Sequence, residues 1–193
     1  DLKKITSKKK NFSKLNFQKI PNIMGVLNLT PDSFSDGGKF NNLTKANKHI
    51  INMINSGAKI IDIGGESTRP GSKTIPTDKE WYRIKNVIKN FKKKFKKTSL
   101  SIDTRKSIIM NKSIKCKADI INDVSGFNYD DKTLSLLKKN KIVKILHHMQ
   151  GNPNTMQKKP KYKNVLLDIY DFFESNIEKL NDKNIIIDPG IGF

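Results

Sequence analysis

Cysteine, arginine and long apolar runs are scarce in this chain of 193 residues. The single cysteine, Cys116, excludes an internal disulfide and leaves no cysteine cluster for zinc. No stretch approaches the ~20 consecutive apolar residues of a membrane span, and the first residues lack the apolar centre of a secretory signal. We therefore expect a cytoplasmic protein, and one domain over residues 1–193, because about 100 to 200 residues are typical of one domain.

Acidic residues are also few, with 18 Asp and Glu against 38 Lys and Arg, so that the net charge is +20. Such a charge could serve nucleic-acid binding, because lysine and arginine displace the counterions of phosphates. However, only Arg69, Arg83 and Arg105 are arginines, and the lysines gather where helices face water, as in residues 89–97, without interleaved aromatic residues. Solvated helix faces are the favoured interpretation, and we expect no nucleic-acid partner and no membrane partner.

Strand-like and helix-like segments alternate along the chain. The strand-like segments are short, continuous and apolar, as in strands buried on both faces, and they cover residues 23–29, 59–63, 100–102, 118–121, 142–146 and 184–187. The segments with helical spacing cover residues 43–56, 78–95, 107–115, 130–140 and 162–180. This alternation predicts an α/β fold in which parallel strands are joined by helical crossovers.

The ends of the predicted strands distinguish an open doubly wound sheet from a barrel. The first strand is not followed by the G-x-G-x-x-G turn of a dinucleotide-binding sheet. Polar groups instead close the strands, at Asn28, Asp62, Asp103, Asn122, His148 with Met149, and Asp188. In a barrel these ends surround one pocket. We therefore predict a (β/α)8 TIM barrel, truncated to about six βα units, with residues up to 19 adding a short strand or hairpin at the other end.

Six motifs carry a resemblance to a known family. They read IMGVLNLTPDSFSDGG, IIDIGGESTRPGS, SIDTRK, IINDVSG, HMQGNPNTMQ and DPGIGF, in this order. Together they resemble dihydropteroate synthase, which condenses (7,8-dihydropterin-6-yl)methyl diphosphate with p-aminobenzoate and releases pyrophosphate. The resemblance implies small-molecule substrates, a pterin-binding (β/α) barrel and a magnesium ion at Asn28. One asparagine alone is a poor metal signal, although Mg²⁺ accepts a few oxygen ligands beside its waters.

The resemblance also implies roles for residues at the strand ends. The pterin slot falls to Asp103, Asn122 and Asp188, and the p-aminobenzoate side to Thr68 and Pro70. A carboxylate such as Asp188 can accept two parallel bonds from a pterin, and Asn122 offers both a donor and an acceptor. Asp103 is our candidate catalytic group, because a fixed carboxylate stabilises positive charge that develops on the methylene. Helix capping and turn formation are the alternatives for these polar residues.

Two segments rich in Gly and Pro, residues 30–40 and 66–75, are predicted to close over the pocket as lids. Phe34 would then form an apolar wall for the aromatic amine, and Asp36 a catalytic polar contact in the closed site. Arg69 would add positive charge near the diphosphate.

Three further residues also have assignments. By resemblance, His148 faces the pocket and Met149 packs near the pterin ring. Arg105 stands where relatives commonly carry a small polar residue, and solvent exposure is the simplest interpretation of this difference.

The sequence ends at DPGIGF, before the Lys and the Arg-x-His that the family carries on its last two strands. We therefore expect a domain that is incomplete at its C-terminus, which would be inactive as it stands and would form a homodimer when complete. Two alternatives stay open: a non-catalytic truncated remnant, and a pterin-binding domain that transfers a methyl group to a corrinoid.

Overall fold

The computed structural model describes residues 11–12, 15–16, 22–30, 39–69, 71–151, 155–157 and 159–191. Three residues with predicted roles, Phe34, Asp36 and Pro70, lie outside this part of the chain. Most of the predicted lid 30–40 lies outside it as well, so that closure of this segment stays a prediction.

Six parallel strands form one sheet in the order of the sequence. They are β3 (Ile23–Asn28), β4 (Ala58–Gly64), β5 (Ser99–Asp103), β6 (Ile120–Asp123), β7 (Val143–His147) and β8 (Ile185–Asp188). The predicted alternation and strand positions are confirmed, because each of the six apolar runs overlaps one of these strands. Among the described residues the sheet is not closed, and β3 and β8 form its two edges.

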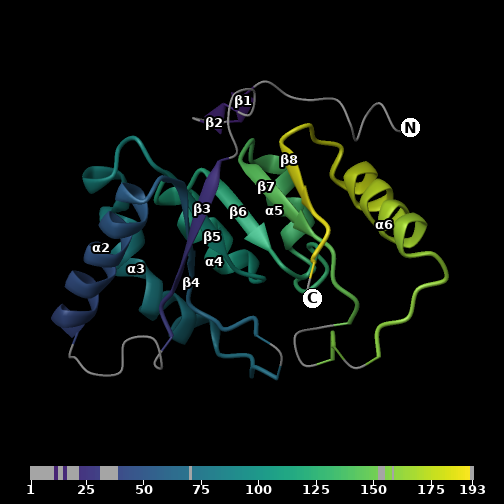
Figure 1. Ribbon diagram of the computed structural model, residues 1–193, viewed down its shortest axis with the longest axis horizontal. Coiled ribbons are helices and arrows are strands. Elements are labelled where there is room, and N and C mark those ends of the chain that lie inside the picture. The colour runs from purple at the N-terminus through teal and green to yellow at the C-terminus, as the bar shows by residue number, and fades with distance from the viewer. Residues whose placement is uncertain are drawn as a thin grey trace.

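Within the part of the chain that the structure describes, the crossovers between these strands contain five helices. They are α2 (Lys39–Asn55), α3 (Thr77–Lys94), α4 (Ser107–Lys115), α5 (Thr133–Lys139) and α6 (Val165–Leu180). In the view of Figure 1, α2 and α3 lie at the left of the curved sheet and α6 lies at its right, and residues of all three helices pack into one apolar core. Among the described residues, no helix is both long and apolar enough to cross a bilayer.

Two helices begin later than the sequence pattern predicts, and polar side chains explain both. Asn164 caps α6, because its side-chain oxygen accepts bonds from Leu166 N at 3.1 Å and Leu167 N at 3.3 Å. Asp130 lies before α5, where its carboxylate accepts bonds from Lys132 N and, across the chain, from Ser107 N at the start of α4. Side-chain bonds to the backbone therefore replace the first helical turn that we predicted at both places.

The two faces of the sheet carry different side chains. The outer face packs against the helices in a large apolar core that includes Ile61, Ile63, Ile102 and Leu146. The inner face holds a smaller apolar cluster near the beginnings of the strands, formed by Leu15, Ile60, Ile120, Val143 and Ile145. Because side chains alternate along a strand, the remaining inner positions lie toward the strand ends.

A short hairpin of β1 (Asn11–Phe12) and β2 (Leu15–Asn16) lies beside the beginnings of the strands (Figure 1). Its Leu15 is 3% exposed and packs into the inner cluster. This confirms the predicted hairpin at the end of the sheet opposite the polar strand ends.

Candidate active site

Four residues of neighbouring strands form one row across the inner face at the strand ends. In the ladder, Asn28 of β3 pairs with Gly64 of β4, Gly64 with Asp103 of β5, and Asp103 with Asn122 of β6. Strict register in a parallel sheet puts these positions side by side. The structure therefore brings together three of the residues that the sequence singled out, and it adds a glycine between them.

Gly64 leaves a small hollow in this row. A Cβ atom at this position would lie 3.2 Å from Asn28 Oδ1 and 3.3 Å from Asp103 Oδ2. Both oxygens therefore line the space that a side chain would fill. This explains why the motif has glycine at the end of a buried strand, where a larger residue would pack better.

Asp62 lies one layer below the row on the same face, because it precedes Gly64 by two residues in β4. It is 4% exposed, and its Oδ2 accepts a bond from Asn122 Nδ2 at 2.9 Å. Burial raises the pKa of the Asp62 carboxyl, although the Asn122 amide and the nearby Ser101 hydroxyl act in the opposite direction. Asp62 thus holds the Asn122 amide in place, a role that we did not predict for it.

The Asp103 carboxyl is the most strongly perturbed group of the site. Burial raises its pKa well above the ordinary value, and the neighbouring charges of Asp62 and Asp123 add to this rise. Three buried oxygens, Oδ1 of Asp62, Asp103 and Asn122, have no hydrogen-bond partner among the described residues. Buried acceptors are normally satisfied, so a group of unpaired ones indicates a place for a ligand with N–H donors.

Asp123 follows Asn122 and is fully buried behind the row. Its Oδ1 accepts bonds from Ser125 N at 2.8 Å and Ser125 Oγ at 2.6 Å. Burial nevertheless dominates and raises the pKa of Asp123 to about 6. This residue forms the turn after β6 and adds negative charge close to Asp103.

The ends of β7 and β8 correct one prediction. His147, and not His148, faces the site, since His147 Nδ1 lies 2.9 Å from Asp188 Oδ2. His148 packs on the outer side, with its ring 5.0 Å from Phe172 and 6.0 Å from Tyr162, and burial lowers its pKa. Successive strand side chains point to opposite faces, so a shift by one residue reverses the assignment.

Asp188 has the position that we predicted for a pterin ligand, at the end of β8. The bond with His147 holds the pKa of Asp188 below its ordinary value, so that this carboxyl is ionised near neutral pH. Its other oxygen accepts a bond from Gly190 N at 2.9 Å. Met149 follows β7 and is half-buried, and its contact with a pterin ring stays a prediction.

The segment after β4 has a fixed base and an exposed tip. Glu66 is buried and bonds to Arg105, to Lys106 Nζ at 2.5 Å and to Ile75 N at 3.1 Å. Thr68 is half-buried and Arg69 is exposed, so both remain accessible beside the strand ends.

Our interpretation of Arg105 as a solvent-facing residue is wrong. Its side chain is 6% exposed, pairs with Glu66 and lies 4.3 Å above the ring of Tyr129. An unpaired arginine is rarely buried, and the acidic partner that allows this burial lies 39 residues away in the sequence.

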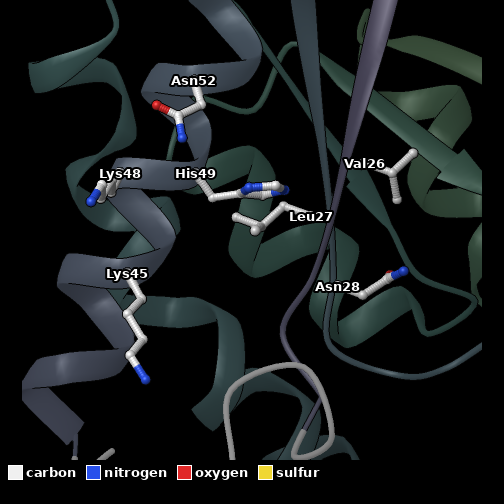
Figure 2. A pocket seen from close by; sticks show the side chains of 7 residues that line it. All are labelled: Val26, Leu27, Asn28, Lys45, Lys48, His49 and Asn52. Atoms are coloured by element: carbon white, nitrogen blue, oxygen red, sulfur yellow. The ribbon is translucent and has the colours of Figure 1, made fainter.

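A pocket of about 470 Å³ lies between the edge strand β3 and helix α2. Figure 2 shows Leu27 and His49 side by side in it, whereas Asn28 points to the opposite side of the strand. Lys45 and Lys48 of α2 add positive charge to its rim. The pocket shares only Asn28 with the row of site residues, so it is separate from the hollow at Gly64.

The fold, with polar strand ends around one inner face, is that of a (β/α) barrel enzyme. A family model described as pterin binding enzyme matches residues 24–193. The chain belongs to this family of pterin-binding enzymes, as the six motifs predicted. Among curated relatives, the dihydropteroate synthase of Escherichia coli K12 is 41% identical over 178 residues, which are 90% of this chain and 62% of the relative.

Solved structures agree with this family. A dihydropteroate synthase of Yersinia pestis in complex with a sulfonamide drug has a TM-score of 0.82 and 40% identity, over 90% of this chain and 64% of that one. The enzyme of Xanthomonas albilineans with 4-aminobenzoic acid has a TM-score of 0.81 and 34% identity, over 91% and 63% of the two chains. The barrel class is thereby confirmed, and the chain spans about 62% of the length of its curated relative.

Proposed function

We propose that the natural protein that contains this chain catalyses the dihydropteroate synthase reaction in folate biosynthesis. One observation carries the proposal: buried, unpaired acceptors of Asp62, Asp103 and Asn122 lie together on the inner face at the strand ends. A pterin has several ring and amino N–H donors, which such acceptors can bind. The amine nitrogen of p-aminobenzoate attacks the pterin methylene, the C–O bond to diphosphate breaks, and the nitrogen loses a proton.

The pterin is held by residues of three strands. Asn122 binds the edge of the heterocycle with an oxygen that is still unpaired, while its amide nitrogen is held by Asp62. Asp188 is ionised and oriented by His147, so its oxygens can accept from the 2-amino group and the neighbouring ring N–H. The side chain of Met149 adds an apolar contact to the ring.

Asp103 stabilises the positive charge that develops when diphosphate leaves. Its raised pKa in the free protein reflects burial and the like charges beside it. N–H donors of a bound pterin favour the ionised form and lower this pKa. Substrate binding therefore converts Asp103 to the ionised form. A carboxylate that is fixed before the reaction stabilises the transition state more than the ground state.

The diphosphate side includes Asn28 and Arg69. The residues present fit a magnesium ion, which Asn28 would hold, since Asn28 Oδ1 lines the hollow at Gly64 and Mg²⁺ needs few protein ligands. The described residues hold no group of three or more His, Cys, Asp or Glu that could bind a metal alone. When bound, the ion would neutralise charge on the departing diphosphate.

The segments after β3 and β4 form the binding place for p-aminobenzoate. Thr68 is accessible and Pro70 is its near neighbour in the chain, so this segment can cover an aromatic amine from one side. Phe34 supplies the apolar wall and Asp36 the polar contact when the first segment closes. Closure excludes water that would otherwise capture the electrophilic methylene.

The two alternatives have less support. In a non-catalytic remnant, nothing would select for three unpaired buried acceptors that lie together, because each one costs stability. The relative and the solved structure reported above are dihydropteroate synthases, which speaks against a corrinoid methyltransferase. We infer further that the complete protein is a single-domain barrel that acts in the cytoplasm as a homodimer.

The test is an assay of the full-length natural protein with dihydropterin diphosphate and p-aminobenzoate. We expect dihydropteroate and pyrophosphate in equal amounts, and inhibition by a sulfonamide that increasing p-aminobenzoate relieves. Inhibition that p-aminobenzoate does not relieve would contradict the proposed amine site. A protein that binds pterin without forming product would favour the remnant.

A further inference from the structure

Four buried charged residues lie beside the site and have no part in the chemistry above. They are Glu66 and Glu80 as acids and Arg105 and Lys106 as bases, all at most 7% exposed. Lys106 Nζ joins the two acids, at 2.5 Å from Glu66 Oε2 and 2.5 Å from Glu80 Oε2. Arg105 pairs with the other oxygen of Glu66. The group is electrically neutral, so each charge depends on the others for its burial.

Glu66 occupies a special place in this group because it meets both ends of one loop. It begins the segment 66–75, and its Oε2 accepts a bond from the backbone N–H of Ile75, where the segment ends, at 3.1 Å. Arg105 Nη2 also reaches Thr74 Oγ1 at 3.4 Å. A single carboxylate therefore closes the base of the loop, while the tip with Thr68 and Arg69 stays accessible.

Glu66 and its partners Arg105 and Lys106 form what we call the clamp. The other side of this clamp is the turn that follows the candidate catalytic residue. Thr104, Arg105 and Lys106 come directly after Asp103, the last residue of β5. Thr104 Oγ1 donates to Glu80 Oε1 at 2.6 Å, which ties the same turn to α3. Gly65 packs against α3 as well, since a Cβ there would lie 2.9 Å from Glu80 O. The loop and Asp103 thus share one anchor.

We propose that Glu66 is a positioning residue that fastens the loop 66–75 to the turn after Asp103 and so sets the affinity of the site for the aromatic amine. This inference rests on the proposed function, which assigns the binding of p-aminobenzoate to that loop. A loop that is already ordered at its base loses less entropy when a ligand binds to its tip. Both carboxylate oxygens of Glu66 are bonded within the protein, to Arg105, Lys106 and the N–H of Ile75, so its effect reaches the amine through the loop.

The experiment compares Glu66→Gln with Asp182→Asn in the full-length natural protein. Both changes turn a carboxylate that pairs with a buried lysine into an amide, but Asp182 pairs with Lys144 at the opposite end of the strands. For Glu66→Gln we expect an increase of about tenfold in the KM for p-aminobenzoate and less than about twofold in the KM for the pterin substrate. For Asp182→Asn we expect neither KM to change.

Amide hydrogen exchange provides a second measurement that does not require turnover. Exchange of the backbone amides of residues 67–75 should become at least about tenfold faster in Glu66→Gln and stay unchanged in Asp182→Asn. Unchanged exchange in Glu66→Gln, or an equal rise of both KM values, would overturn the proposal. If the wild type forms no dihydropteroate, the proposed function fails, and the exchange comparison still decides whether the clamp exists.

Should Glu66→Gln not fold, Thr74→Val takes its place. Thr74 is exposed, and the change removes only the loop-side acceptor of Arg105 while all four charges stay. We expect faster exchange in the loop and an increase of about twofold in the KM for the amine alone. No change in either measurement would count against the clamp.

Discussion

At their beginnings the strands enclose apolar side chains, whereas at their ends they surround carboxylates and amides. Leu15 and Ile120 close the inner face at the first end. The fully buried Lys144 near that end pairs with Asp182 and also donates to Asn140 O. At the other end, Asp103 and Asn122 keep buried oxygens without a partner among the described residues.

The difference teaches where stability and chemistry reside in this chain. Lys144, the buried charge near the strand beginnings, has its partners within the protein, and losing the charged partner would cost stability. Under the proposed function, the unpaired oxygens of Asp62, Asp103 and Asn122 at the strand ends bind a ligand, and they cost stability until it binds. Barrel enzymes divide the two tasks in the same way, with reactive groups at the C-terminal face.

Breaking the ion pair near the strand beginnings should have the largest effect on stability. In Asp182→Asn the ammonium of Lys144 remains fully buried without a charged partner, so we expect the free energy of unfolding to fall by about 3 kcal/mol. Urea denaturation of the full-length protein measures this loss. Pterin affinity should not change, and a weaker affinity would show that the two ends of the strands are not independent.

At the opposite end, Asp103→Asn should damage the reaction more than the fold. The amide keeps the shape but cannot carry the negative charge, so we expect kcat to fall about 100-fold, which is about 2.7 kcal/mol in the barrier. Pterin affinity, measured by calorimetry, should fall much less. Equal losses in kcat and in pterin affinity would remove the special role of Asp103 in the transition state.

The smallest of the three expected effects is a change in stability at Asp123. Its pKa is raised to about 6 in the folded state, so folding takes up a proton between pH 3.8 and about 6, and stability falls as the pH rises through this window. The full difference corresponds to at most about 3 kcal/mol.

Asp123→Asn should therefore stabilise the protein at pH 7.5. The new amide nitrogen has no evident acceptor, so we expect a net gain of about 1 to 2 kcal/mol. Urea denaturation at pH 7.5 and pH 4 checks the sign, because the gain should disappear at pH 4. A gain that persists at pH 4 would mean that burial of the charge is not its cause.

The sequence predicted the strands well because their apolar runs are continuous and regularly spaced. It also predicted that Asn28, Asp103 and Asn122 lie around one pocket, since each of them ends a parallel strand, but it did not predict that Gly64 of β4 separates Asn28 from Asp103. It misplaced His148, because a run of two histidines does not show which of them is in register with the inner face. It missed the burial of Arg105, because Glu66 becomes its neighbour only when β4 and β5 pair, and no local pattern contains that contact.

The hairpin at the start of the chain has a consequence for the order of folding during synthesis. Leu15 leaves the ribosome early, but its binding place is made by residues such as Ile120 and Ile145, which follow by more than 100 positions. Contacts so distant in sequence form late. The hairpin can therefore pack only after β6 and β7 have been synthesised and the beginnings of the strands have formed. Until then it stays exposed to chaperones and proteases.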